Sequence, residues 1–423
     1  MALFLASALV GLAAAQSPGD KPENHPGLTT WECTKDGGCL QKNTYVVLDS
    51  LAHPVYQVDA PEYNCGSWGN PPNATACPDA ETCQQNCIMQ GVEDYTKVGV
   101  FTEGASMRME LLGDNGAELS PRVYLLSEDK ETYEMLSLTG KEFTFDVDVS
   151  NLPCGMNGAL YLSEMPADGG LSELNQAGAY WGTGYCDAQC YTTPFIGGEP
   201  NLEGYGACCN EMDIFEANSR AMHVAPHPCN VTGLVECEGA ECEADGICDK
   251  PGCAYNAWRF DNEEHYGLGL EVDTTRPFTV ISQYPADENG ILTGFHRMYI
   301  QDGRLIDNGE VVRPSLPQID YLNDELCEAT YAEHFLRLGA TAGMGEAMTR
   351  GMVLAMSIWW DRGGNMQWLD GGEAGPCNPT EGHPDEIVKV EPRPEVTYSN
   401  IKWGEIGSTF KDPSKCKSRR SKV

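Results

Sequence analysis

Three carboxylic acids, Glu211, Asp213 and Glu216, lie close together in the chain and are separated only by apolar residues. From Glu211 to Ile214 polar and apolar residues alternate, which is the pattern of a β-strand with one face on a core. Glu211 and Asp213 therefore share a face. Glu216 stands at an odd offset and would point to the other face, unless Ile214 or Phe215 is the extra residue of a β-bulge.

A bulge would bring the two glutamates close enough to act on one glycosidic bond. Five strand steps of ~3.3 Å span roughly 16 Å, and a bulge shortens this distance by about 3 Å. Side chains that each reach about 4 Å would leave the carboxyl groups roughly 5 Å apart, the separation expected of a retaining glycosidase. The alternative, a solvated acidic strand face, is disfavoured because three neighbouring carboxylates repel one another.

The composition limits the partners and the compartment of the protein. The 423 residues carry a formal net charge of −36, so nucleic acid and anionic membranes would be repelled and a neutral substrate is favoured. Nineteen cysteines indicate an oxidising compartment and a disulfide framework. Zinc binding is disfavoured because the chain contains no Cys-x-x-Cys pair, and we expect neither a metal nor a cofactor.

The two ends of the chain differ in composition from the part between them. The apolar run from Leu3 to Leu12 is too short to cross a bilayer and is followed by three alanines, as in a signal peptide. We expect residues 1–15 to be this signal, residues 16–410 to form one monomeric extracellular domain, and the basic residues 411–423 to be disordered. Glycosylation motifs at Asn73 and Asn230 should lie on exposed loops.

Short strand patterns with Gly and Pro turns recur along the chain. The clearest is the alternation from Phe143 to Val149, whereas helical patterns are restricted to short segments near residues 80–90 and 344–350. This distribution predicts an all-β sandwich of two antiparallel sheets. His223 and His227 have the spacing of a metal pair on a helix, but Pro226 between them makes a helix, and with it the metal pair, unfavourable.

The segment Cys-Cys-Asn-Glu-Met-Asp-Ile-Phe-Glu-Ala-Asn-Ser, residues 208–219, resembles glycoside hydrolase family 7, the secreted fungal cellulases. The resemblance runs from about His25 to Thr409. Further motifs that carry it are Phe143–Val149, Leu152–Tyr161, Gly182–Cys190, Pro226–Cys229, Ser357–Asp361 and Ser399–Gly404. It implies a curved β-jelly-roll sandwich with a long substrate cleft on its concave face.

The resemblance also implies roles for single residues. Glu211 would be the nucleophile, Glu216 the general acid and base, and Asp213 a hydrogen-bond partner of Glu211. Repulsion among the three acids is expected to keep Glu216 protonated while Glu211 stays ionised. Tryptophans would stack on glucose rings, although core packing is an equal alternative for Trp359. The implied substrate-binding residues are Arg122, Asn157, Tyr161, Tyr185, Gln189, His227, Trp359 and Trp368.

The departures from the family pattern indicate which kind of cellulase this is. The segments between Glu203 and Cys208 and between Trp368 and Cys377 are short, where the tunnel-forming cellobiohydrolases carry long loops. Residues 49–54 also lack the tryptophans of the tunnel entrance. An open cleft and an endo-β-1,4-glucanase acting on cellulose and soluble β-glucan are therefore predicted. A processive cellobiohydrolase and a lectin are the alternatives; a lectin would not need the paired glutamates.

The family framework further implies nine disulfides and leaves Cys416 without a partner. The implied pairs are Cys33–Cys39, Cys65–Cys87, Cys77–Cys83, Cys154–Cys377, Cys186–Cys209, Cys190–Cys208, Cys229–Cys248, Cys237–Cys242 and Cys253–Cys327.

Overall fold

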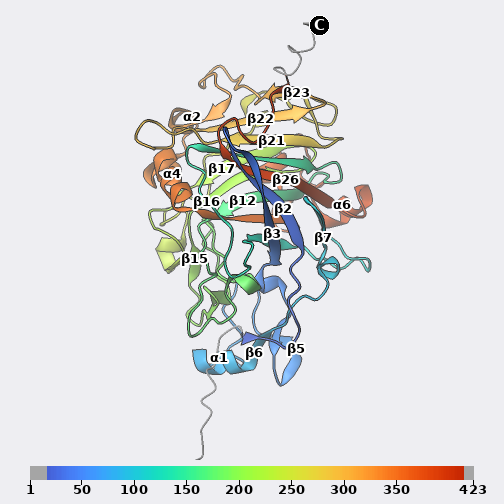
Figure 1. The fold of residues 1–423 in the computed structure, drawn as a ribbon, viewed down its shortest axis with the longest axis vertical. Helices are drawn as coiled ribbons and strands as arrows, with labels where there is room; N and C mark the ends of the chain where they lie inside the picture. The colour runs from blue at the N-terminus through green and yellow to red at the C-terminus, as the bar shows by residue number, and fades with distance from the viewer. Residues whose placement is uncertain (1–16, 414–423) are drawn as a thin grey trace, which may run out of the picture.

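The computed structural model of the chain describes residues 17–413 (Figure 1). The predicted signal peptide, Cys416 and most of the basic tail lie outside these residues. Within them, no helix is both long enough and apolar enough to cross a membrane. The side chains of Asn73 and Asn230 are exposed, as their predicted loop positions require.

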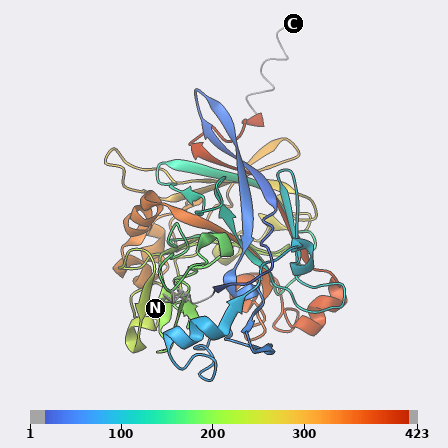
Figure 2. The ribbon, with the colours of Figure 1, turned by 60° about the horizontal axis from the view of Figure 1, so that its bottom comes forward.

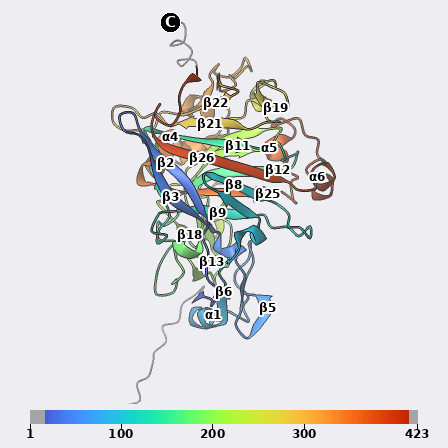
Figure 3. The same ribbon diagram turned by 45° about the vertical axis from the view of Figure 1, so that its right-hand side comes forward.

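A mixed sheet of 16 strands forms most of the fold. Figure 3 shows part of its order, from β22 through β21, β11 and β26 to β2. The main path runs through β17 (Met222–His227), β16 (Glu211–Ala217), β12 (Met156–Ser163), β25 (Met352–Trp360), β9 (Arg122–Leu126), β3 (Gly38–Leu48), β2 (Gly27–Thr34), β26 (Glu395–Glu405), β11 (Lys141–Asp148), β21 (Phe278–Gln283), β22 (Phe295–Gln301) and β23 (Arg304–Asp307). The strands β7 (Val100–Glu103), β8 (Ser106–Glu110), β10 (Met135–Leu136) and β24 (Tyr321–Leu322) attach beside this path.

The large sheet folds back on itself, so that its two halves pack face to face. Phe145 on β11 contacts Phe215 on β16, with ring centroids 5.6 Å apart, although these strands are far apart in the sheet order. The inward face predicted from Phe143 to Val149 is confirmed, since Phe143, Phe145 and Val147 are buried in the core between the halves; on the other face Asp146 and Asp148 are half-buried, but Thr144 is buried. Apolar burial between the halves is therefore the main stabilising contribution to the fold.

The predominance of β-structure is confirmed, but the sheets are not separate and not purely antiparallel. The long hairpin of β2 and β3 carries the hydrogen-bond ladder from one half to the other, because β3 pairs with β9 while β2 pairs with β26 (Figure 1). The contact between β2 and β26 is parallel. Two predicted sheets are thus joined into one.

Smaller sheets and short helices surround this framework. A four-stranded sheet lies beside α1 at the lower end of the molecule in Figure 1, the end that Figure 2 brings forward, and helices α2 and α4 lie at the edge opposite α6 (Figure 1). The helix predicted near residues 80–90 ends at Asn86, because Cys87 enters a strand, and the one predicted at 344–350 begins earlier, at Ala340. The helices are α1 (Ala80–Asn86), α2 (Asp324–Ala329), α3 (Glu333–Arg337), α4 (Ala340–Arg350), α5 (Gln367–Asp370) and α6 (Pro384–Val390). The smaller sheets comprise β1 (Ser17–Pro18), β6 (Cys87–Met89), β4 (Val55–Gln57) and β5 (Ala60–Asn64); β13 (Phe195–Ile196) and β14 (Glu199–Pro200); β15 (Gly206–Cys208) and β18 (Val235–Cys237); and β19 (Tyr266–Gly267) and β20 (Val272–Asp273).

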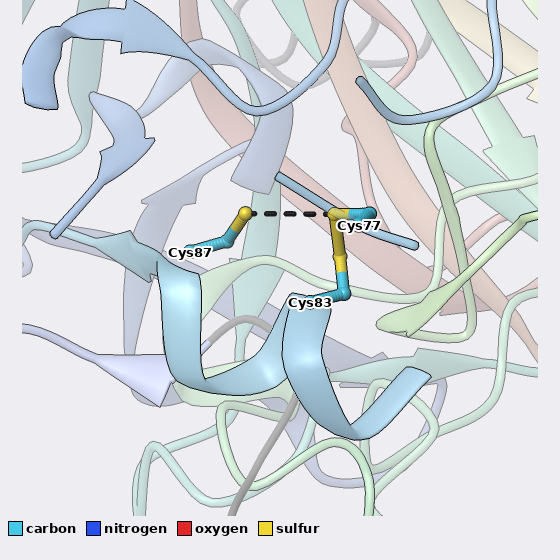
Figure 4. A group of neighbouring side chains, drawn as sticks. All are labelled: Cys77, Cys83 and Cys87. Atoms are coloured by element: carbon cyan, nitrogen blue, oxygen red, sulfur yellow. Dashed lines mark hydrogen bonds between the residues drawn. A yellow bond between two sulfur atoms is a disulfide. The ribbon is translucent and has the colours of Figure 1, made fainter. Parts of the chain in front are cut away.

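All nine implied disulfides are present. In the cluster of Figure 4, Cys77 is bonded to Cys83, and its sulfur lies 3.6 Å from that of Cys87. Because Cys87 is itself bonded to Cys65, each of the three drawn sulfurs already belongs to a disulfide and none is a thiolate that could bind a metal.

Candidate active site

The predicted bulge lies in the middle of β16. Asp213 pairs with Tyr161 of β12, and the preceding residue of β12, Leu160, pairs with Phe215, which leaves Ile214 without a partner in this ladder. The ladder to β17 is also shifted, between Asp213 and Glu216. The prediction that Ile214 or Phe215 is the extra residue is therefore confirmed, and the residue is Ile214.

The bulge places all three acids on one face of the sheet. Glu211, Asp213 and Glu216 lie opposite alternate residues of β12, between Ala159 and Ser163, and alternate residues of a strand point to the same side. The three side chains line a cleft of about 920 Å³. Two disulfides, Cys186–Cys209 and Cys190–Cys208, fix the chain just before this strand.

Glu211 is buried at the base of the cleft and accepts a hydrogen bond from the backbone N–H of Ala188 at 3.1 Å. Burial and the nearby charges of Asp213 and Asp187 raise its pKa well above the usual value of a glutamate. The positive charge of His227 and the Ala188 N–H act in the opposite direction, because both stabilise the carboxylate.

Glu216 accepts a hydrogen bond from the side-chain amide of Asn157, at 2.8 Å. The carbonyl oxygen of Asn157 in turn accepts the backbone N–H of Ala217. Burial, followed by the charge of Asp213, raises the pKa of Glu216 to about 8. Asn157 is fully buried, so the structure places this predicted sugar-binding residue behind Glu216 and not in the wall of the cleft.

Asp213 forms a buried ion pair with His227, in which the histidine Nε2 lies 2.9 Å from the carboxylate. The other ring nitrogen donates to the backbone carbonyl of Asp249 at 2.8 Å. Burial alone would lower the pKa of His227, but the hydrogen bond and charge of Asp213 outweigh it and raise the pKa to about 10. The predicted hydrogen bond from Asp213 to Glu211 is not formed among the described residues: Asp213 is paired with His227, and Glu211 accepts from the Ala188 N–H.

We predicted that Glu216 is protonated while Glu211 is ionised, but the directions of their pKa shifts do not distinguish the two glutamates. Burial raises the pKa of both Glu211 and Glu216. What distinguishes them is the hydrogen-bond donor, which is a backbone N–H for Glu211 and an amide side chain for Glu216.

Seven of the eight predicted substrate-binding residues line the cleft. They are Arg122, Tyr161, Tyr185, Gln189, His227, Trp359 and Trp368. Arg122 is oriented by the carboxylate of Asp49, to which it donates from Nε at 3.1 Å and from Nη2 at 2.7 Å. Its guanidinium lies 3.4 Å from the centre of the Tyr185 ring. These contacts hold a cation and an aromatic ring in fixed positions along the cleft.

The two tryptophans stack near one another, with ring centroids 6.2 Å apart and planes inclined by 27°. Trp368, on α5, is 39% exposed, and Trp359, on β25, is half-buried. Because Trp359 lines the cleft, the alternative that it packs only in the core is not supported.

Several residues of the cleft had no clear signal in the sequence. His223 lies on β17 opposite Glu216. Its ring packs edge-to-face with that of Trp368, with ring centroids 5.8 Å apart. The even offset from His227 could have placed both histidines on one strand face, and the inference that they do not lie on a helix is confirmed. Asp49 and Trp68 come from segments far from β16 in the chain; only the family resemblance placed residues 49–54 near the cleft entrance, and nothing in the sequence indicated Trp68.

Comparisons with known proteins identify the family of the chain. The family model "Glycosyl hydrolase family 7" matches residues 18–410. An endoglucanase of Humicola insolens is 56% identical over 416 residues, which cover 98% of this chain and 96% of that protein. The native structure of the Humicola insolens endocellulase is 56% identical and superposes with a TM-score of 0.92, covering 93% of this chain and all of that one. A family 7 cellobiohydrolase from Daphnia pulex is 36% identical, with a TM-score of 0.86 over 93% of this chain and all of its own. The resemblance found in the sequence is thus confirmed, and the chain belongs to glycosyl hydrolase family 7.

Proposed function

We propose that this protein is an endo-β-1,4-glucanase that hydrolyses internal bonds of cellulose and related β-glucans with retention of anomeric configuration. The observation that carries the proposal is the bulge at Ile214, which puts Glu211 and Glu216 on one face of a cleft lined by aromatic rings. Relatives that are more than half identical to this chain over nearly its whole length are named endoglucanases.

In the first step Glu211 attacks the anomeric carbon, while Glu216 donates its proton to the glycosidic oxygen and the leaving chain departs as an alcohol. In the second step Glu216, now a carboxylate, takes a proton from water, and the hydroxide displaces Glu211 to release the sugar. A pKa of about 8 keeps Glu216 protonated at neutral and acidic pH, as the first step requires. The Ala188 N–H and the charged His227 favour the ionised form of Glu211.

Asp213 and His227 act as a fixed charge pair beside the nucleophile. Because His227 remains protonated across neutral pH, Asp213 is neutralised locally and does not add a full uncompensated charge next to Glu211. The backbone contact of His227 with Asp249 holds the imidazole in place. We propose that this pair orients Glu211 and tunes its charge without touching the bond that breaks.

The cleft is proposed to be a long open groove on the concave face of a jelly-roll sandwich. Tryptophans 359 and 368 would stack on glucose rings, and Arg122, Tyr161, Tyr185 and Gln189 would bind hydroxyl groups. At the segment where the family's cellobiohydrolases carry entrance tryptophans, the cleft is lined by Leu51 and Ala52. These side chains cannot form a stacking entrance, which supports an endo-acting enzyme over a processive one.

We further propose a secreted monomer of one catalytic domain, residues 16–410, with glycans at the exposed Asn73 and Asn230 and no metal or cofactor. Nine disulfides agree with an oxidising compartment. A related endoglucanase, 53% identical, has been solved in complex with cellobiose, which supports a cello-oligosaccharide as the occupant of the cleft.

Two measurements test the proposal. On carboxymethylcellulose the viscosity should fall much faster than soluble reducing ends appear, and proton NMR of a digested cello-oligosaccharide should show the β-anomer first. Glu211→Gln serves as the control for contaminating activity. Viscosity loss in proportion to soluble ends would instead indicate exo action, and an initial α-anomer would refute the double displacement.

A further inference from the structure

A buried arginine lies beneath the catalytic strand, in the opposite half of the sheet. Arg297 is on β22, on the inward face between Phe295 and Tyr299, and its side chain is 4% exposed. None of the ion pairs formed within residues 17–413 includes Arg297. A cation buried without a carboxylate is costly, so this position is expected to bring a compensating benefit.

The guanidinium crosses the core to reach the bulge. Its Nη2 donates a hydrogen bond to the backbone carbonyl of Ile214, the extra residue of β16. Nη1 lies 3.9 Å from the sulfur of Met222, and the guanidinium also interacts with the side chain of Tyr299, whose ring centre is 5.9 Å away. The bond to Ile214 is the contact that reaches the catalytic strand, and it serves a residue that has no partner in the β12 ladder.

Arg297 lines a small cavity of about 10 Å³, and its buried Nε atom has no hydrogen-bond partner among the described residues. Ser282, Tyr284 and Asn308 line the same cavity, and each has a buried oxygen without a protein partner. A cavity of this size with several polar atoms can hold one water molecule. The side of the guanidinium that does not bind Ile214 can thus be satisfied without a carboxylate.

We propose that Arg297 is a positioning residue for glycoside hydrolysis: by binding the carbonyl of Ile214 it fixes the bulge that keeps Glu216 on the same face as Glu211. Arg297 acts through the backbone and touches no substrate. Without its donor, the buried carbonyl would have to find another partner, and regular pairing of β16 would turn Glu216 toward the core. The inference rests on the roles proposed for the two glutamates.

Arg297→Met tests this role, because methionine keeps an unbranched apolar side chain and removes every donor. Gln301→Met is the matched control: Gln301 lies on the same strand and face, is 7% exposed, and bonds Asp273 instead of β16. On a soluble β-glucan, Arg297→Met should lose about 100-fold in kcat with KM within about threefold, as expected for a misplacement near 1 Å. Gln301→Met should lower Tm while keeping kcat within about threefold of wild type.

Two further readouts separate positioning from general destabilisation. Arg297→Lys keeps one donor for Ile214 but loses the fixed planar fork, so it should lose about tenfold in kcat, a smaller loss than in Arg297→Met. In Arg297→Met the basic limb of the pH profile of kcat/KM should move to lower pH, because Glu216 would leave the neighbourhood of Asp213. Arg297→Lys should show the same shift of the basic limb to a smaller extent, and it carries the test if the methionine variant does not fold.

The results that overturn the proposal are distinct from failure of the proposed function. An active wild type together with a folded Arg297→Met that keeps its kcat and its pH profile would refute the role of Arg297 alone. For a methionine variant that does not fold, an Arg297→Lys with the kcat and pH profile of wild type would do the same. A wild type without activity on β-glucan or cellulose would overturn the hydrolytic function itself, and the inference with it.

Discussion

The two cleft histidines of β17 offer a controlled test of the buried charge beside Glu211. His227 and His223 lie on the same strand face, four residues apart, and both are buried. The pKa of His227 is raised to about 10 by its contact with Asp213, so this histidine is charged at neutral pH. Burial, Arg259 and the charge of His227 lower the pKa of His223 to about 3, so His223 is neutral. His227→Gln therefore removes a charge at neutral pH, whereas His223→Gln does not.

The expected loss in His227→Gln follows from the buried pair, in which both side chains are 8% exposed. Removing one partner of such a pair costs roughly 3–5 kcal/mol of unfolding free energy. A histidine whose pKa is raised on folding contributes stability that is complete below about pH 6.5 and is lost as pH rises toward 10. At about 1.4 kcal/mol per pH unit, the difference in unfolding free energy between wild type and His227→Gln should shrink by roughly 3 kcal/mol from pH 6.5 to pH 9.

His223→Gln should behave with the opposite sign. A histidine whose pKa is lowered on folding contributes stability that is present above about pH 6.5 and is lost as pH falls through the folded pKa. As the pH falls from 6.5 to 5, the unfolding free energy of His223→Gln should therefore rise by roughly 2 kcal/mol relative to that of wild type. Above pH 7 the difference in unfolding free energy between the two proteins should be constant.

The assay is chemical unfolding with the disulfides intact, at intervals from pH 5 to pH 9, on wild type and both variants. Differences between the curves cancel the titration of groups common to all three proteins. Parallel curves for wild type and His227→Gln from pH 6.5 to pH 9 would show that His227 is not held in its charged form. The electrostatic account of the nucleophile given above would then be wrong.

Three predictions concern catalysis and binding. Glu211→Gln should abolish turnover on soluble β-glucan while calorimetry still detects cello-oligosaccharide binding, because the amide has the same shape but cannot attack the anomeric carbon; wild-type turnover in this variant would contradict the assignment. Glu216→Gln should lose activity on β-glucan and be rescued on an aryl β-cellobioside whose leaving group needs no proton, whereas an equal loss on both substrates would exclude its role as the acid. Trp368→Ala should weaken substrate binding by roughly 1–3 kcal/mol through lost stacking area, with little dependence on salt since the chain is neutral. Steady-state kinetics at low and high ionic strength test this last prediction, which an unchanged kcat/KM would refute.

Local pattern alone specified much of the catalytic strand. The alternation from Glu211 to Ile214 predicted that Glu211 and Asp213 share a face, because strand periodicity depends only on neighbours in the chain, and the odd offset of Glu216 required a bulge if all three acids act together. The alternation from Phe143 to Val149 predicted an inward face in the same way. Motifs characteristic of the family carried the nine disulfides, which no spacing rule could have paired.

The contacts that set charge and geometry were decided only by the tertiary structure. Asp213 meets His227 instead of Glu211, and Asn157 meets Glu216 from 59 residues away instead of lining the cleft. Arg297 reaches the carbonyl of Ile214 across 83 residues and through the core between two packed halves. A local pattern fixes the face on which a side chain lies. The residue that this side chain contacts depends on which distant strand is folded against that face. Here the β2–β3 hairpin joins the two halves of the sheet, and the packing of these halves against each other determines the contacts.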